Sequence, residues 1–391
     1  MFRVALTMYS KHRKGFPVNL NFKRSAALVG AVAVSSFALV ACGDSEDTTT
    51  DNGNGGETTT GASAEGLTGA TGQLVGEGAS SQQAAMDYFG IQYSETVEGA
   101  SLAYTASGSG SGRRNFVGGQ VAFGGSDSPM DDEQAAEAMD RCDGNEAWHL
   151  PFVIGPVAIA YNLPGVDTLN LSIATVAEIF KGEITNWNDD AIAAENDGVE
   201  LPDMDISVVY RSDESGTTDN FQKFLTAAEP DLWDTTGQVF PSEVGEGANG
   251  SNGVASQVTA IEGGITYVEA GFATQQGLGV ANLDFGNGPV ELNAESVGVA
   301  LDALEFLTEG HNMVVDTDAL FASDTDGSYP LVLTTYEVVC SAGYDDTTRD
   351  QVKDFLTVAL DSQDDTLESL GYIPVTGTHH ERLTDAVEAI Q

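Results

Sequence analysis

Three places in the sequence put glycine and small hydroxyl residues where a strand gives way to a helix. They lie at residues 76–81, 107–112 and 211–218. A helix N-terminus presents unpaired backbone N–H groups and the positive end of the helix dipole, and serine or threonine adds hydroxyl donors. One such loop alone is most often an ordinary N-cap. Three of them in one chain indicate a site that can hold a tetrahedral oxyanion with little positive charge nearby.

Two charged residues accompany these loops. Arg211 ends a strand, and its planar guanidinium could grip two oxygens of an anion while Asp213 orients it; the alternative is a surface salt bridge. Asp127 follows a Gly-Gly-Ser string. A buried carboxylate there could accept a hydrogen bond from protonated phosphate and would repel fully ionised sulfate. The alternative is that Asp127 caps the helix that follows Pro129.

Motifs for catalysis are missing from the sequence. The patterns G-x-S-x-G, H-E-x-x-H and G-x-x-x-x-G-K-[ST] do not occur, and the five histidines show no ligand spacing with the cysteines. A match to G-x-G-x-x-G at residues 245–250 follows no clear strand, so we interpret it as a glycine-rich loop near the site or as a turn. We therefore expect a binding protein without a metal or cofactor, and not an enzyme.

The three loops need strands and helices to position them. Short apolar runs at 73–75, 101–105, 120–123 and 206–210 read as strands, and each is followed by small residues and then by helical periodicity. This alternation is typical of α/β proteins. Two longer apolar stretches are expected to cross between lobes, and they lie at 148–161 and 329–336.

Together these residues resemble the phosphate-binding protein of the bacterial high-affinity phosphate ABC uptake system. The resemblance runs from about Leu67 to the C-terminus. It rests on these strings: Gly78–Ser81, Gly108–Gly112, Phe123–Asp127, Ile179–Asp189, Arg211–Thr217 and Gly263–Glu269. One position departs from the family pattern, because Ser80 and Ser81 stand where the family usually has threonine followed by a large apolar residue.

The resemblance implies a set of ligand-binding residues. It comprises Ser80, Ser81, Ser109, Asp127, Arg211, Ser215, Gly216 and Thr217. Asp127 would accept the proton of the anion, Arg211 would be its single cation and Asp213 would brace Arg211. We expect Arg211→Ala to reduce affinity at unchanged thermal stability of the unliganded protein.

The resemblance also implies the fold and the function. We expect an α/β, two-lobed type II periplasmic-binding-protein fold with a two-strand hinge. One lobe would comprise residues 68–152 and 330–391, and the other 153–329. The monomer would capture inorganic phosphate between the lobes and deliver it to the permease and ATPase complex of an ABC importer. The alternatives are a receptor for sulfate or molybdate, a secreted phosphoesterase, and a surface sensor or adhesin.

The N-terminal segment has the features of a lipoprotein signal. Six basic and no acidic side chains lie in the first 24 residues, and an uncharged run follows at 25–41. The run ends in a sequence that resembles the bacterial lipobox, with Cys42 as the acylated residue; the alternative is a retained apolar anchor. Residues 43–66 contain no aromatic side chain and no aliphatic side chain larger than alanine, so we expect residues 42–67 to form a flexible tether. We expect the folded part on the extracytoplasmic face of the membrane.

Charge and cysteine content add two expectations. Without residues 1–41 the chain keeps nine basic side chains against 60 acidic ones, which disfavours binding to nucleic acid and anionic lipid headgroups. With Cys42 acylated, Cys142 and Cys340 remain as an even pair in an oxidising compartment. We expect them to form a disulfide.

Overall fold

The structure is a computed structural model that describes residues 66–241, 244–323 and 325–391. The expected signal peptide (1–41), the acylated Cys42 and nearly all of the expected tether (42–67) lie outside the described residues. Within the described ranges, no helix has the length and apolar composition needed to span a bilayer.

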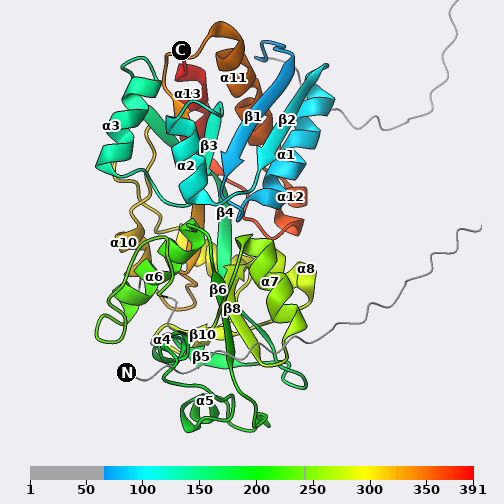
Figure 1. Ribbon diagram of the computed structural model, residues 1–391, viewed down its shortest axis with the longest axis vertical. Helices are drawn as coiled ribbons and strands as arrows, with labels where there is room; N and C mark the ends of the chain where they lie inside the picture. The colour runs from blue at the N-terminus through cyan, green and yellow to red at the C-terminus, as the bar shows by residue number, and fades with distance from the viewer. Residues whose placement is uncertain (1–65, 242–243, 324) are drawn as a thin grey trace, which may run out of the picture. The chain divides into compact units, whose positions relative to one another are not determined.

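The described strands form two sheets (Figure 1). The large sheet has the order β2-β1-β3-β12-β4-β8-β6-β7, with β9 paired to β4, and the small one has the order β11-β10-β5. The strands are β1 (Gly72–Gly78), β2 (Ala100–Thr105), β3 (Phe123–Ser126), β4 (Ala147–Asn162), β5 (Asn170–Ser172), β6 (Ser207–Arg211), β7 (Glu246–Ala248), β8 (Gly264–Glu269), β9 (Gly279–Val280), β10 (Asn282–Asp284), β11 (Pro289–Val290) and β12 (Val332–Cys340).

Helices flank the large sheet at both of its ends. At one end α1 contacts β2 and α11, and α2 contacts β1 and β3; at the other, α7 contacts β6 and β8. The helices are α1 (Gln83–Thr96), α2 (Ser109–Val117), α3 (Asp132–Arg141), α4 (Ile173–Lys181), α5 (Asp190–Glu195), α6 (Gly216–Ala228), α7 (Gly250–Ala260), α8 (Ala270–Gln276), α9 (Ala294–Leu301), α10 (Thr317–Phe321), α11 (Asp346–Asp361), α12 (Asp365–Ser369) and α13 (Gly377–Ala389). This is the two-lobed α/β arrangement predicted from the sequence.

Parallel pairing brings the predicted loops to one region. β1 pairs in parallel with β2 and β3, and β6 pairs in parallel with β7 and β8. In α/β sheets, ligands bind at the carboxyl ends of parallel strands. The loops after β1, β2, β3 and β6 all leave such ends, so the topology directs their hydroxyl residues toward a common place.

Two long strands connect the two ends of the large sheet. Residues 147–156 of β4 pair with β12, and residues 157–162 of the same strand pair with β8. Both strands are almost entirely buried, which explains their continuous apolar sequence. The pairing of β4 with β12 shifts register between Thr335 and Tyr336, where β4 carries Phe152 as an extra residue.

The expected disulfide is present. Cys142 and Cys340 are joined with their Cα atoms 5.4 Å apart, and both are fully buried. Cys340 is paired in the sheet with Ala147, the first residue of β4. Cys142 is the C-cap of α3, so the bond fastens the end of α3, just before β4, to the end of β12.

One strand and one helix have boundaries that differ from those expected from the sequence, because glycine residues allow their backbones to pack closely. The strand expected at 120–123 is β3, which starts at Phe123 and includes Gly124 and Gly125. Helix α2 starts at Ser109, inside the expected loop 107–112. A Cβ at Gly112 would lie 2.5 Å from the Gly125 carbonyl oxygen and 2.6 Å from the Gly78 Cα. These glycines let α2 press against β1 and β3, although glycine normally disfavours both helix and strand.

The string at residues 179–189, one of those that carry the family resemblance, contributes to the core. Phe180, Ile184 and Trp187 are buried, and Gly182 ends α4 in the left-handed conformation (φ 76°). The Trp187 indole N–H donates to the Gly263 carbonyl oxygen at 3.0 Å. Packing explains the pattern of this string.

Candidate anion-binding site

Asp127 lies at the centre of a ring of hydroxyl groups. Its Oδ1 accepts hydrogen bonds from Ser81 Oγ at 2.6 Å and from Thr335 Oγ1 at 2.8 Å. Its Oδ2 accepts from Ser109 Oγ at 3.1 Å. Of these donors, Ser81 and Ser109 belong to two of the predicted loops, and Thr335 belongs to β12. The helix-cap interpretation of Asp127 is wrong, because Asp131 caps α3 by accepting from the Gln134 backbone N–H.

The environment of Asp127 favours its protonated form. Burial, the largest cause, and the charge of Glu269 together raise the pKa of the Asp127 carboxyl to about 6. The hydroxyl donors Ser81 and Thr335 and the charge of Arg211 act in the opposite direction. A carboxyl with this pKa can give up or take a proton near neutral pH, which suits a partner that itself carries a proton.

Arg211 is buried and held by Asp213. Its Nε and Nη2 atoms bond the two carboxylate oxygens of Asp213 at 2.8 Å and 2.5 Å. The Arg211 side chain is only 2% exposed, so the surface salt-bridge interpretation is wrong. Burial acts to raise the pKa of Asp213, but the pairing with Arg211 lowers it more, so the pKa of Asp213 lies below its ordinary value. The remaining Nη1 donates to Thr217 Oγ1 and Ser251 Oγ at 3.3 Å and 3.2 Å.

The third loop begins α6 against Asp127. Ser215 caps this helix, since its hydroxyl accepts from the Thr218 backbone N–H at 3.1 Å. Gly216 follows, and a Cβ there would lie 2.5 Å from the Asp127 Cβ and 2.6 Å from Ser109 Oγ. Only glycine allows this close approach. The N-terminus of α6 therefore directs its free N–H groups toward the region between Asp127 and Arg211.

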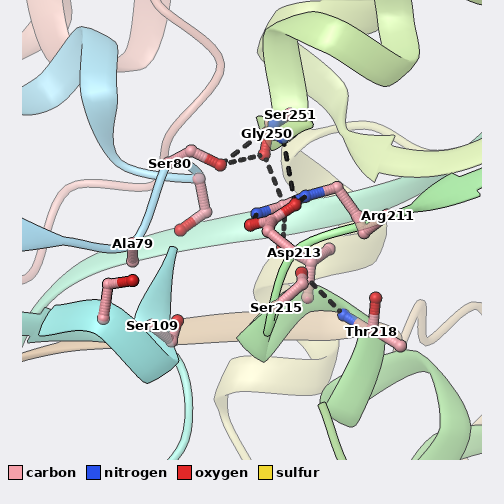
Figure 2. A network of polar contacts seen from close by, with 12 residues as sticks. Ala79, Ser80, Ser109, Arg211, Asp213, Ser215, Thr218, Gly250 and Ser251 are labelled. Carbon is pink, nitrogen blue, oxygen red and sulfur yellow. Dashed lines mark hydrogen bonds and ion pairs between the residues drawn. The ribbon is translucent and has the colours of Figure 1, made fainter. Parts of the chain in front are cut away.

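Ser80 has a partner that the sequence did not predict. Its Oγ accepts from the Ser251 backbone N–H at 2.9 Å and lies 3.1 Å from Ser251 Oγ. Figure 2 shows Ser80 and Ser251 facing each other, with Arg211 and Asp213 beside them. Gly250 N also donates to Asp213 Oδ1 at 3.1 Å. The N-terminus of α7 is thus a fourth helix start at the site.

The structure brings all of the predicted site residues into one connected region. Ser81, Ser109 and Asp127 form its one side, and Arg211 and Asp213 the other. Ser80 is joined to Arg211 through Ser251, and Ser215, Gly216 and Thr217 lie at the start of α6.

Three further residues of the site were not predicted from the sequence. Ser251 follows the glycine-rich match at 245–250, whose last glycine starts α7 after the short strand β7. Thr335 is a hydroxyl residue within a crossing strand. Glu269 ends β8, and its Oε1 accepts from Thr217 Oγ1 at 2.7 Å. A polar residue inside an apolar run was the available signal for the last two.

Comparison with known proteins defines the family. Residues 63–363 match the model of the PBP superfamily domain. The chain is 42% identical to phosphate-binding protein PstS 3 of Mycobacterium tuberculosis over 95% of this chain and 100% of that protein. It is 39% identical to PstS 2 of the same organism, over 95% and 100% of the two chains.

Solved structures agree with the fold. A high-affinity periplasmic phosphate-binding protein, PfluDING, solved with phosphate bound, has a TM-score of 0.64 and 22% identity, covering 80% of this chain and 93% of its own. A phosphate-binding protein from Stenotrophomonas maltophilia has a TM-score of 0.61 and 22% identity, covering 81% and 94%. These likenesses confirm the two-lobed periplasmic-binding-protein fold. With the sequence relatives, they place this chain in the PstS family of phosphate-binding proteins.

Proposed function

We propose that this protein captures inorganic phosphate between its two lobes and delivers it to an ABC importer. The observation that carries the proposal is Asp127. Its buried carboxylate lies among hydroxyl groups, next to the N-terminus of α6 and within electrostatic reach of Arg211. Membership of a family whose relatives are named phosphate-binding proteins supports the same ligand.

The anion would be held by donors from both sides of the site. We assign oxygen contacts to the hydroxyl and backbone donors of Ser80, Ser81, Ser109, Ser215, Gly216 and Thr217 and to the guanidinium of Arg211. Helix N-termini and hydroxyl groups can stabilise an anion without further cations when water is excluded. This matters in a chain with 15 basic and 60 acidic side chains.

Asp127 would supply the selectivity. Phosphate at neutral pH keeps at least one proton and can donate it to the Asp127 carboxylate. Sulfate has no proton to donate and would place a full negative charge against the carboxylate. A buried charge without a partner costs several kcal/mol, so this single residue can separate the two anions.

We assign the lobes and the location as follows. Residues 68–152 with 330–391 would move as one lobe and residues 153–329 as the other, about β4 and β12. Acylation of Cys42 would hold the monomer on the extracytoplasmic face of the membrane, where it would meet the permease and ATPase complex. Binding would proceed without chemical turnover of the ligand.

Calorimetric titration tests the proposal. The purified protein is stripped of bound anion and titrated with phosphate, and the titration is repeated in excess sulfate. We expect one phosphate per chain and little change of affinity when sulfate is added. No heat with phosphate, or equal affinity for both anions, would contradict the proposal, and release of product from a chromogenic phosphate ester would indicate an esterase instead.

A further inference from the structure

A second acidic residue is buried behind the first binding loop. Glu337 lies in β12, directly opposite Gly125 of β3 in the antiparallel register. It is fully buried, and within the described part of the chain neither of its carboxyl oxygens has a hydrogen-bond partner. Residues opposite each other in paired strands extend their side chains to the same face. Thr335, two residues earlier on that face, reaches Asp127.

The missing side chain of Gly125 leaves room for two polar groups on this face. A Cβ at Gly125 would lie 2.4 Å from Gln82 Nε2 and 2.3 Å from the Tyr104 hydroxyl. Gln82 is fully buried, and its Oε1 also lacks a partner among the described residues. Gln82 is also the polar side chain that acts on Glu337. The carboxyl oxygens of Glu337 and Oε1 of Gln82 are therefore buried acceptors without a hydrogen-bond partner among the described residues, and their side chains lie close enough to interact.

A hydrogen-bonded chain runs from Gln82 to the binding loop. Gln82 Nε2 donates to the Tyr104 hydroxyl at 3.0 Å, and that hydroxyl donates to the Ala79 carbonyl oxygen at 2.9 Å. Ala79 immediately precedes Ser80 and Ser81. The orientation of the Gln82 amide thus decides whether Tyr104 is held against the backbone of this loop.

An ionised Glu337 does not suit this arrangement. A buried carboxylate without hydrogen bonds is strongly disfavoured. A protonated carboxyl instead supplies the missing donor. A single proton on Glu337 would give both the Glu337 carboxyl and Gln82 Oε1 a hydrogen bond. It would also fix the Gln82 amide with its N–H groups toward Tyr104.

We propose that Glu337 is a positioning residue that keeps its proton at neutral pH, donates it to Gln82 Oε1 and so holds the first binding loop in place for the anion. The inference rests on the proposed function, since it concerns the same site. Beyond the proposed function, it assigns to Glu337 a buried proton that the bound phosphate would not contact.

The surroundings of Glu337 agree with this assignment. Burial, the largest cause, and the charge of Asp127 together raise the pKa of Glu337 to about 8, although the Gln82 side chain acts in the opposite direction. The titratable groups that face Glu337 are Asp127, from the loop after β3, and Tyr104, from β2. β4 contributes the apolar Leu150 opposite Glu337. A bound anion adds negative charge nearby and further disfavours ionisation, so binding and ionisation of Glu337 oppose each other.

The test compares the pH dependence of phosphate affinity in the wild type and in Glu337→Gln. The glutamine amide can donate to Gln82 but cannot ionise. Between pH 7.5 and 9.5 we expect the wild type to lose roughly ten-fold more affinity than Glu337→Gln, as one unit of pKa difference between the free and bound protein requires. Glu95→Gln, an exposed acid-to-amide change on α1, serves as the matched control and should follow the wild type.

Two further measurements keep the outcome clear. Titrations at pH 8.5 in buffers of different ionisation enthalpy should show greater proton uptake on binding for the wild type than for Glu337→Gln. Infrared difference spectra of the wild type between pH 7 and 10 should show loss of a protonated carboxyl band, which needs no variant to fold. If the wild type does not bind phosphate at pH 7.5, the proposed function fails. If it binds, and its pH profile parallels that of Glu337→Gln or the carboxyl band is absent, the assignment of Glu337 is wrong.

Discussion

Asp127 alone combines two properties that a selective anion site needs. Its carboxylate is desolvated, so its charge acts strongly on an anion, and three hydroxyl groups hold its two oxygens in fixed positions. Ser81 shows how the departure from the family pattern is used, because its hydroxyl bonds Asp127 where a large apolar side chain would have no such contact. In the proposed function, discrimination between phosphate and sulfate would depend on the Asp127 carboxyl group and its immediate donors.

Asp127→Asn should weaken the preference for phosphate over sulfate. The amide removes the negative charge and replaces one of the two acceptor oxygens by an N–H donor, while the surrounding hydroxyl groups can rotate to satisfy it. We expect the ratio of phosphate to sulfate affinity to fall roughly ten- to a hundred-fold, the usual range for a hydrogen bond to a charged group. Competition calorimetry measures this ratio. Asp131→Asn, which changes the α3 cap and keeps a capping residue, is the control, and sulfate rejection equal to wild type in both variants would contradict the role of Asp127.

Arg211→Ala should weaken binding and also destabilise the unliganded protein. The sequence led us to expect unchanged stability, but the buried pairing with Asp213 changes that expectation. Without Arg211 a largely buried carboxylate remains unpaired, which costs about 3–5 kcal/mol of unfolding free energy in comparable cases. Urea denaturation measures the loss, and Arg211→Ala combined with Asp213→Asn should recover part of it. An unfolding midpoint like that of the wild type in Arg211→Ala alone would oppose this account.

The helix starts act as the structural units of the site. α1 begins just after Ser80 and Ser81, and α2, α6 and α7 begin at the site with Ser109, Ser215 to Thr217, and Gly250 with Ser251. α7 is the unexpected one, because Ser251 connects Ser80 of the first loop to Arg211. These contacts join segments that are about 170 and 40 residues apart, so they belong to the assembled elements and not to any local motif.

Ser251→Ala should weaken phosphate binding, because Ser251 helps to hold the two sides of the site together when the lobes close on the anion. The variant removes the hydroxyl contacts to Ser80 and Arg211 but keeps the backbone N–H that donates to Ser80. One or two hydrogen bonds at about 1 kcal/mol each correspond to a roughly five- to thirty-fold loss of affinity, mainly as faster dissociation. Stopped-flow fluorescence gives the dissociation rate. Ser256→Ala, on the exposed side of the same helix, should dissociate like the wild type, and equal rates in both variants would exclude Ser251 from closure.

Gly216→Ala should prevent the approach of α6 to Asp127. The added Cβ meets the Asp127 Cβ and Ser109 Oγ well inside contact distance. Overpacking of this kind costs about 1–3 kcal/mol, or roughly ten- to a hundred-fold in affinity if the strain is relieved by opening. Titration calorimetry checks it. Gly253→Ala in α7, where the nearest atoms lie at 3.8 Å, is the control, and normal affinity in Gly216→Ala would show that the site accommodates a methyl group.

At the scale of the whole molecule, much of the fold and part of the site follow from sequence pattern. Alternating strands and helices, the two long apolar stretches and the hydroxyl-rich helix starts carry local signals, and Arg211 and Asp127 stand out chemically. Thr335, Ser251, Glu269 and Glu337 do not, since their roles depend on which face of which strand or helix meets a distant loop. A sequence shows a polar residue in an apolar run but not the partner that tertiary packing gives it.

The charge of the whole molecule should slow phosphate capture. The formal net charge of −45 repels an anion before it reaches the local donors. Screening shortens this repulsion to about 10 Å at 0.1 M salt. We therefore expect the association rate for phosphate to rise as sodium chloride increases from 10 mM to 300 mM, while the dissociation rate changes little. A rate that falls with salt in stopped-flow measurements would mean that a local positive potential dominates.

The register shift between Thr335 and Tyr336 has a consequence for the mechanics of the lobes. Paired strands in regular register resist bending, whereas an extra residue such as Phe152 leaves the ladder locally unpaired and bends the strand. The disulfide fastens the end of β12 to the end of α3, just before β4 begins, so bending would concentrate at this step. Thr335, at the same step, holds Asp127. With the proposed hinge, the pivot of the lobes and the carboxyl group assigned to the ligand's proton would be neighbours, and rotation of the lobes would act on recognition without any intervening relay.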